Sequence, residues 1–178
     1  MRRLILISAL VSLSVAAAHA QVALYVTSSS ARFSNTQTVS TSFWTSSIGG
    51  GISTTYIPMG PVNLSFDLRG SARPGTPGSD TGLIGVKLAS NAPALRIKPY
   101  LQASGGYVKT RSVDLVTSNT LYSRYAAWEI LGGLDYPIAH SVDLRVIEFG
   151  GGAGYHLNGA SGPSLSLLTI NTGIVFHF

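Results

Sequence analysis

His156 has the only surroundings in this sequence that suggest catalysis. It precedes the polar segment LNGASGP, in which Ser161 lies nearby, whereas His140 falls in an expected turn and His177 lies beside the chain end. A serine nucleophile, a histidine base and an acid that orients the base are the machinery of acyl transfer and hydrolysis. No His, Asp and Glu set has metal-ligand spacing, and no glycine-rich phosphate loop precedes a helix. We therefore expect that the protein binds no cofactor and is not an enzyme. The alternative is a lipid acyl hydrolase.

Charged side chains alternate with apolar ones in several segments. In VNLSFDLRG, Asp67 and Arg69 alternate with Phe66 and Leu68, and VDLRV (142–146) repeats the pattern. Successive side chains of an extended strand point to opposite faces. The pattern therefore predicts strands with one apolar face and one polar face on which opposite charges can meet.

Eight such segments follow residue 20, and none of the chain beyond that point carries a convincing helical stripe. Each is long enough for a tilted strand to cross a bilayer, which takes about 9–11 residues. The predicted strands are 22–33, 43–57, 62–71, 82–90, 97–110, 123–136, 141–155 and 164–178.

The first 20 residues have the pattern of a cleaved signal peptide. Arg2 and Arg3 precede an apolar stretch, and Ala18 and Ala20 supply the small residues that signal peptidase requires. The rival interpretation, an uncleaved anchor, needs about 20 apolar residues. We expect cleavage after Ala20 and one domain over 21–178, with no further module.

The composition narrows the remaining classes. The chain has no cysteine, so neither a disulfide framework nor a lipid-modified N-terminal cysteine is available. The formal net charge of +5 is scattered rather than gathered in a basic run, so we expect no nucleic-acid partner. A soluble periplasmic protein or a membrane protein built from strands remains.

The links between the predicted strands favour the membrane protein. The links after strands two, four and six are the turns PMGP, NAPALR and PIAH, whereas those after strands one, three, five and seven are longer and polar. Short turns at one end and longer loops at the other are typical of outer-membrane barrels. A soluble sandwich or barrel, with the apolar faces as its core, is the alternative, because alternation alone does not separate the two.

Three segments resemble the small OmpA/OmpX-type outer-membrane β-barrel domain: KPYLQASGGYVKT (98–110), GGLDYPIAHSVDLRVIEF (132–149) and NTGIVFHF (171–178). The resemblance implies an eight-stranded antiparallel up-and-down transmembrane β-barrel without shared catalytic residues. It also implies that the last strand is the recognition signal for the outer-membrane assembly machinery. Ile170, Ile174, Phe176 and Phe178 match that signal, and Thr172 departs from it. Barrels that deacylate lipid A carry a His-x-Ser-Asn run near this position, whereas Leu157 and Asn158 follow His156 here.

An eight-stranded barrel encloses only enough space for side chains to fill. Charges of both signs on the polar faces therefore predict an ion-pair network that plugs the lumen, whereas a selective channel favours a lining of one sign. We expect Lys98 to bridge Asp135 and Asp143. The predicted network comprises Asp67, Arg69, Lys87, Lys98, Glu129, Asp135, Asp143 and Arg145.

Glu148 does not fit the alternation of apolar and polar residues in its strand. Strict alternation after Val146 directs this charged side chain toward lipid. A bulge near Ile147 and Glu148 returns it to the interior; alternatively it lies in the interfacial zone.

The sequence thus predicts an integral bacterial outer-membrane barrel with a structural or surface-interaction role. The alternatives are a narrow channel for small or apolar solutes and a lipid-modifying enzyme. The expected partners are outer-membrane lipid, lipopolysaccharide and the barrel assembly machinery, and the expected state is a monomer.

Overall fold

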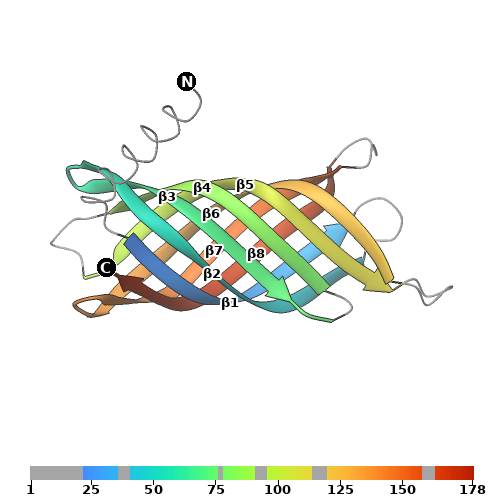
Figure 1. Ribbon diagram of the computed structural model, residues 1–178, viewed down its shortest axis with the longest axis horizontal. Helices are drawn as coiled ribbons and strands as arrows, with labels where there is room; N and C mark the ends of the chain where they lie inside the picture. Colours follow the sequence, from blue (N-terminus) through green and yellow to red (C-terminus); the bar gives the residue numbers. More distant parts are fainter. Residues whose placement is uncertain (1–21, 36–40, 76–77, 91–95, 114–119, 158–162) are drawn as a thin grey trace, which may run out of the picture.

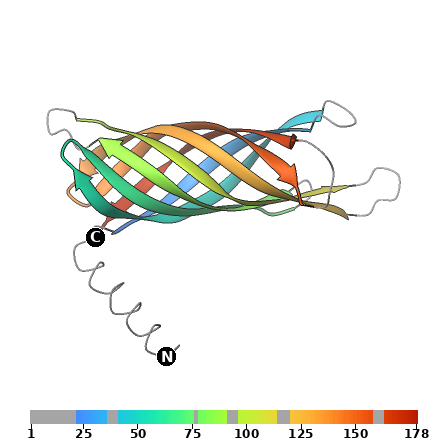
Figure 2. The same ribbon diagram turned by 90° about the horizontal axis from the view of Figure 1, so that it is seen from above.

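The computed structural model describes residues 22–35, 41–75, 78–90, 96–113, 120–157 and 163–178. Each strand pairs antiparallel with the next, and β1 also pairs with β8, so the sheet closes into a barrel (Figures 1 and 2). The predicted eight-stranded antiparallel barrel is therefore confirmed. Within these ranges, no helix has the length and apolar character needed to cross a membrane. The strands are β1 (Val22–Asn35), β2 (Thr41–Met59), β3 (Val62–Arg73), β4 (Gly78–Ser90), β5 (Lys98–Val113), β6 (Thr120–Ala139), β7 (Val142–His156) and β8 (Pro163–His177).

The start of β1 and the end of β8 lie at one end of the barrel, called here the terminal end (Figure 1). Two links at this end are two-residue turns, 60–61 and 140–141, and Gly60 adopts a positive φ of 69° in the first. The third link, expected to be a tight turn, spans 91–97, and residues 91–95 lie outside the described residues. The links at the opposite end, called the loop end, are 36–40, 74–77, 114–119 and 157–162.

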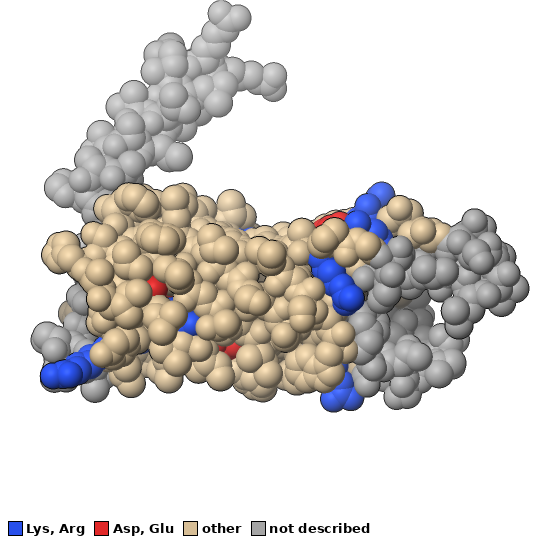
Figure 3. Space-filling view, turned by 90° about the horizontal axis from the view of Figure 1, so that it is seen from below, with Lys and Arg blue, Asp and Glu red and all other residues tan. Residues whose placement is uncertain are grey.

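The alternation along each strand separates the interior of the barrel from its exterior. On β3, Ser65 and Asp67 are buried inside, while Phe66 and Leu68 are 49% and 55% exposed outside. Large apolar side chains are exposed on the outward face of each of the other strands as well. On the face shown in Figure 3, lysine and arginine gather mainly at the ends of the barrel. The exterior is therefore an apolar band, as a lipid-facing wall requires.

A bulge on β7 directs Glu148 into the interior. The pairing with β8 moves from Arg145 opposite Gly173 to Glu148 opposite Asn171, so β7 carries one extra residue between these pairs. Val146 and Ile147 consequently both point outward, at 48% and 45% exposure, and Glu148 is fully buried. The predicted bulge is confirmed, one residue earlier than expected.

The interior is layered along the barrel axis. Nearest the terminal end, Ala23, Tyr25 and Val175 form a small apolar cluster. Next along the barrel axis come charged side chains from β3, β4, β6 and β7. Beyond them lies a larger apolar cluster, which the alternation of charged and apolar residues did not predict. Its members are Ala31, Val108, Tyr125, Ala127, Leu165 and Leu167.

Candidate functional site

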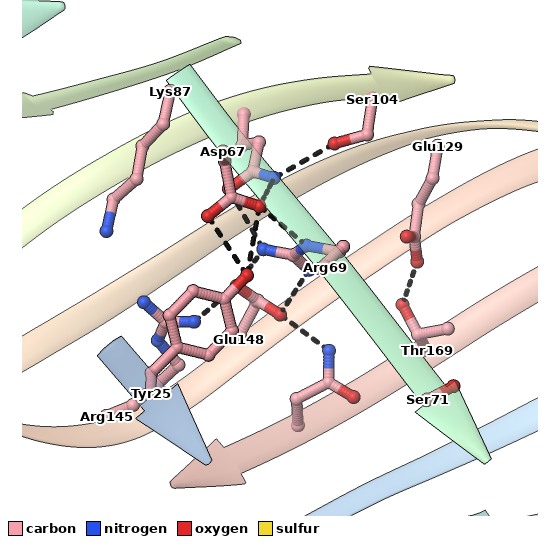
Figure 4. A network of polar contacts seen from close by, with 12 residues as sticks. Tyr25, Asp67, Arg69, Ser71, Lys87, Ser104, Glu129, Arg145, Glu148 and Thr169 are labelled. Carbon is pink, nitrogen blue, oxygen red and sulfur yellow. Dashed lines mark hydrogen bonds and ion pairs between the residues drawn. The ribbon is translucent and has the colours of Figure 1, made fainter. Parts of the chain in front are cut away.

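Polar side chains from β1 and from every strand between β3 and β8 meet inside the barrel (Figure 4). We call this group the waist network. It adjoins the small apolar cluster, with which it shares Tyr25, and the larger cluster lies beyond it toward the loop end. Its members are Tyr25, Asp67, Arg69, Lys87, Tyr100, Gln102, Asp135, Arg145, Glu148 and Asn171.

Arg69 connects two carboxylates within the waist network. Its Nε donates to Asp67 Oδ1 at 3.1 Å, and its Nη1 and Nη2 donate to Glu148 Oε1 and Oε2 at 2.9 and 3.2 Å. Nη2 also donates to Gln102 Oε1 at 2.9 Å, and the Gln102 amide donates to Asp67 Oδ1 at 2.7 Å. The two-pronged contact with Glu148 is the geometry for which guanidinium and carboxylate groups are matched. Arg69 is thereby fixed from three directions.

Arg145 holds the second half of the waist network. Its Nε and Nη2 donate to the two oxygens of Asp135 at 3.0 and 3.4 Å, and its Nη1 lies 3.4 Å from Glu148 Oε2. Lys87 Nζ donates to Asp135 Oδ2 at 3.4 Å. Glu148 therefore contacts both arginines, and Asp135 contacts both Arg145 and Lys87.

Two tyrosines enclose these charges. The Tyr25 hydroxyl donates to both oxygens of Asp67, at 2.9 and 3.0 Å, and the Tyr100 hydroxyl donates to Glu148 Oε2 at 2.5 Å. The Arg145 guanidinium carbon lies 4.5 Å from the ring centre of Tyr25 and 5.0 Å from that of Tyr100. Each tyrosine therefore binds a carboxylate through its hydroxyl and a cation through its ring face.

The waist network is electrically balanced. Its cations are Arg69, Lys87 and Arg145, and each forms an ion pair with at least one of its carboxylates. The carboxylates are Asp67, Asp135 and Glu148, each at most 5% exposed. Taking an ion out of water costs several kcal/mol in a protein, and such burial is tolerated when each charge is paired and hydrogen-bonded. The pairing seen here meets that condition.

The other three predicted interior charges lie apart from the waist network. Glu129 accepts a hydrogen bond from Thr169, on the side of the network nearer the loop end. Lys98 Nζ binds Asp143 Oδ2 at 2.7 Å near the terminal end, and His177 Nε2 lies 2.8 Å from the same oxygen. Lys98 is paired with Asp143, while Asp135 is paired with Arg145 and Lys87, so Lys98 does not bridge the two carboxylates as expected.

The two sides of the waist network enclose different amounts of space. On the terminal side is a polar vestibule of about 400 Å³, whose lining includes Lys87, Lys98, Asp135 and Asp143. On the loop side the cavity is about 50 Å³, with Arg69 in its wall. The vestibule has room for several waters, whereas the inner cavity has room for few, since one water occupies about 30 Å³ in the liquid.

His156 is placed away from the waist network. Its ring centre lies 4.4 Å from that of Tyr125, and Ser161 falls outside the described residues. His140 is exposed in the 140–141 turn. Over the described ranges, no three His, Asp or Glu side chains group as they do around a metal ion.

The last strand presents its apolar side chains to the exterior. Ile170, Ile174 and Phe176 are 38%, 41% and 40% exposed, and Phe178 is 76% exposed just beyond the end of β8. The Phe178 amide donates to the Val22 carbonyl at 2.9 Å, so the closing β1–β8 pairing extends to the last residue.

Five members of the waist network were not among the predicted site residues: Glu148, which was treated separately because it breaks the alternation, and the neutral residues Tyr25, Tyr100, Gln102 and Asn171. Alternation alone could have placed Tyr25 inside, because Leu24 and Val26 flank it as outward residues. Gln102 shares the polar face that the sequence assigns to its strand. A search restricted to charged residues overlooks the neutral donors that satisfy buried carboxylates.

No protein-family model and no curated protein sequence matches this chain. Solved structures do resemble it. Neisserial surface protein A is 15% identical with a TM-score of 0.55, covering 88% of this chain and 97% of its own. Ail, the attachment invasion locus protein of Yersinia pestis in complex with the heparin analogue sucrose octasulfate, is 7% identical with a TM-score of 0.56, covering 89% and 99%. The N-terminal β-barrel domain of Pseudomonas aeruginosa OprF is 13% identical with a TM-score of 0.50, covering 88% and 97%.

At these identities the likeness concerns the fold. Nearly the whole length of each of these proteins is covered by the match, and the chain itself is a closed barrel with an apolar exterior and a polar waist. The chain has the fold of the small eight-stranded outer-membrane β-barrels, the class to which the OmpA/OmpX-type domain belongs.

Proposed function

We propose that this chain is an integral protein of a bacterial outer membrane, exported through a cleaved signal peptide over residues 1–20, with a structural or surface-interaction role. The observation that carries the proposal is the closed wall: every strand is paired on both sides, and its outward face is apolar. Backbone N–H and C=O groups find no partner in hydrocarbon, so a sheet survives there only when it is closed. The same wall exposed to water leaves an apolar surface uncovered on all sides.

The terminal end faces the periplasm in this proposal. Two-residue turns at 60–61 and 140–141 support this orientation, because short turns mark the periplasmic side of such barrels. Ile170, Ile174, Phe176 and Phe178 then end at the periplasmic interface, where the assembly machinery reads the last strand. Fractionation of cell envelopes tests the location, with gel mobility before and after boiling as the measure of folding. Recovery in the soluble periplasmic fraction, with unchanged mobility, contradicts the proposal.

We further propose that the lumen is plugged rather than conducting. The paired charges of the waist network and the apolar cluster around Val108 support this, because the first fills the middle of the lumen and the second blocks the path to the loop end. Reconstitution in planar bilayers is the test. We expect no steady unitary current from the wild-type protein. Reproducible openings support the alternative, a narrow channel for small solutes.

The enzyme alternative rests on His156 alone. Incubation of the folded barrel with lipid A and with phospholipid, followed by mass spectrometry, tests it. We expect no released fatty acid. A product that disappears in His156→Ala establishes a lipid-modifying activity and contradicts the proposal.

A further inference from the structure

Cations gather on the outward face of β5 and β6 near the loop end. Lys109 and Arg124 lie directly opposite each other on the two strands, and Arg111 follows two residues further along β5. We call these three residues the outer cationic row. Val108 and Tyr125, their neighbours in sequence, are buried in the lumen, so the alternation directs Lys109 and Arg124 to the exterior.

The outer cationic row carries more positive charge than its surroundings neutralise. Asp80 lies opposite Lys109 on β4, but its Oδ1 accepts from Arg111 Nη2 at 2.7 Å. Lys109 Nζ instead lies 4.6 Å from the ring centre of the exposed Tyr122. Among the described residues, neither Lys109 nor Arg124 forms an ion pair. Like charges directly opposite on neighbouring strands repel each other and destabilise the sheet. An external anion between Lys109 and Arg124 reduces that repulsion.

Aromatic side chains set the depth of this row in the membrane. Two residues nearer the terminal end, Tyr107 and Tyr155 point outward on either side of Ala126. Two residues of a strand span about 7 Å. Tyrosines of membrane barrels lie at the level of the lipid headgroups. The outer cationic row therefore lies at headgroup level, within reach of lipid phosphates.

A shallow hollow in the outer wall adjoins the row. Gly50, Gly70 and Gly82 are aligned directly across β2, β3 and β4. The hollow is lined by Gly50 and Gly70, among others, and extends to Thr81, the neighbour of Gly82, and to Asp80, the partner of Arg111. A Cβ atom at Gly82 meets nothing within 4 Å, so the wall is open outward at this point. The surface thus combines a cationic headgroup site with an adjoining shallow hollow whose floor includes glycines of β2 and β3.

We propose that this surface binds a phosphorylated, multiply acylated lipid of the outer leaflet, the lipid A part of lipopolysaccharide. A phosphate lies between Lys109 and Arg124, which neutralises their repulsion, and an acyl chain lies along the glycine hollow. Guanidinium and ammonium groups are the usual phosphate ligands. The inference rests on the proposed outer-membrane location, with the loop end facing outward.

Lipid titration of the barrel purified from outer membranes and placed in neutral nanodiscs tests the proposal. The probes are diphosphoryl lipid A, its dephosphorylated form and phosphatidylglycerol, and bound lipid is counted by native mass spectrometry. We expect diphosphoryl lipid A to bind at least about tenfold more tightly than either other probe. Equal binding of phosphatidylglycerol means that the row attracts any anionic lipid and overturns the lipid A assignment. Equal binding of the dephosphorylated form overturns the phosphate site.

Matched variants localise the site. Lys109→Gln with Arg124→Gln removes two cations, each worth about 1 kcal/mol near an anionic surface, so lipid A binding falls about 30-fold. Arg96→Gln removes an exposed arginine at the terminal end and leaves binding unchanged. Gly82→Leu adds a side chain beside the hollow, at a position where a Cβ meets nothing within 4 Å, and weakens the binding of lipid A more than the binding of phosphatidylglycerol. Unchanged binding in the double variant overturns the inference even when the barrel fractionates with the outer membrane, which separates this failure from failure of the proposed location.

Discussion

Glu148→Gln is the sharpest perturbation of the waist network, because Glu148 contacts both of its arginines. The wild-type carboxylate accepts from Arg69 at 2.9 and 3.2 Å, from Tyr100 at 2.5 Å and from Asn171 at 2.6 Å, and it lies 3.4 Å from Arg145. Glutamine keeps the shape but changes the balanced charge of the network to a net +1. The amide N–H₂ of the glutamine also replaces one of the two acceptor oxygens, so it faces groups that themselves donate hydrogen bonds. Removing one partner of a buried ion pair costs about 3–5 kcal/mol, and we expect that loss in the free energy of unfolding.

Asp80→Asn is the matched control. The Asp80–Arg111 pair has an N–O distance of 2.7 Å, shorter than the 2.9 Å between Arg69 and Glu148, but its side chains are 43% and 23% exposed. Exposed ion pairs contribute about 0–1 kcal/mol. If burial rather than distance decides the energy, the control loses at most about 1 kcal/mol.

Urea titration of the refolded proteins in detergent micelles measures both losses. Trp44 and Trp128, both outward and about half exposed, report the transfer of the wall out of the micelle through their fluorescence. Adding Arg69→Met to Glu148→Gln restores neutrality, so the double variant recovers part of the loss, with a coupling energy of roughly 0.5–3 kcal/mol. A loss under about 1 kcal/mol in Glu148→Gln, equal to that of the control, refutes the claim that these charges are buried from water.

Three further predictions concern the last strand, the packing inside the lumen and the β7 bulge. Phe178→Ser lowers the yield of assembled barrel in cells several-fold but changes the unfolding free energy of refolded protein by under about 1 kcal/mol, because the ring is 76% exposed; equal effects on yield and stability mean that the ring only packs. Gly133→Val destabilises the barrel by about 1–3 kcal/mol in urea titrations, because a Cβ there overlaps the Tyr100 ring; wild-type stability contradicts that overlap. Deletion of Ile147 removes the extra residue of the β7 bulge and leaves regular alternation, with Arg145 and Glu148 inside and Val146 outside between them, so heat-modifiable barrel is still recovered from outer-membrane fractions; its loss means that the bulge itself is needed for assembly.

The wall of this barrel could be predicted from the sequence because it follows from period two. Asp67 and Arg69 alternate with Phe66 and Leu68, and a single strand suffices to assign the faces. Glu148 illustrates how far this logic reaches. Its charge on the expected lipid face pointed either to a bulge nearby or to a position in the interfacial zone, and the structure has the bulge. Both inferences depend on one strand at a time.

The pairing within the lumen could not be predicted from single strands, because it depends on the height of each side chain around a closed sheet. Asp135 is opposite Lys98 on one side and opposite Arg145 on the other. Alternation does not decide between these two neighbours. The Arg145 guanidinium binds Asp135 through two nitrogens, while Lys98 is paired with Asp143. The apolar cluster around Val108 was missed for a related reason: its members come from distant strands and lie at one height.

The buried charges give this barrel something that its apolar residues cannot. In a water-soluble sheet, the apolar face identifies the inside, and a register slip of one residue is penalised because it exposes that face to water. A barrel in lipid has apolar side chains outside, and its interior also contains apolar residues such as Leu131 and Val175. The penalty against a slip must then come from polar groups. A slip of β3 moves Asp67 and Arg69 into hydrocarbon, where an arginine costs about 2–4 kcal/mol near the bilayer midplane and an aspartate adds a smaller cost. The waist network therefore specifies which face of each strand is the inside, whatever its net contribution to stability.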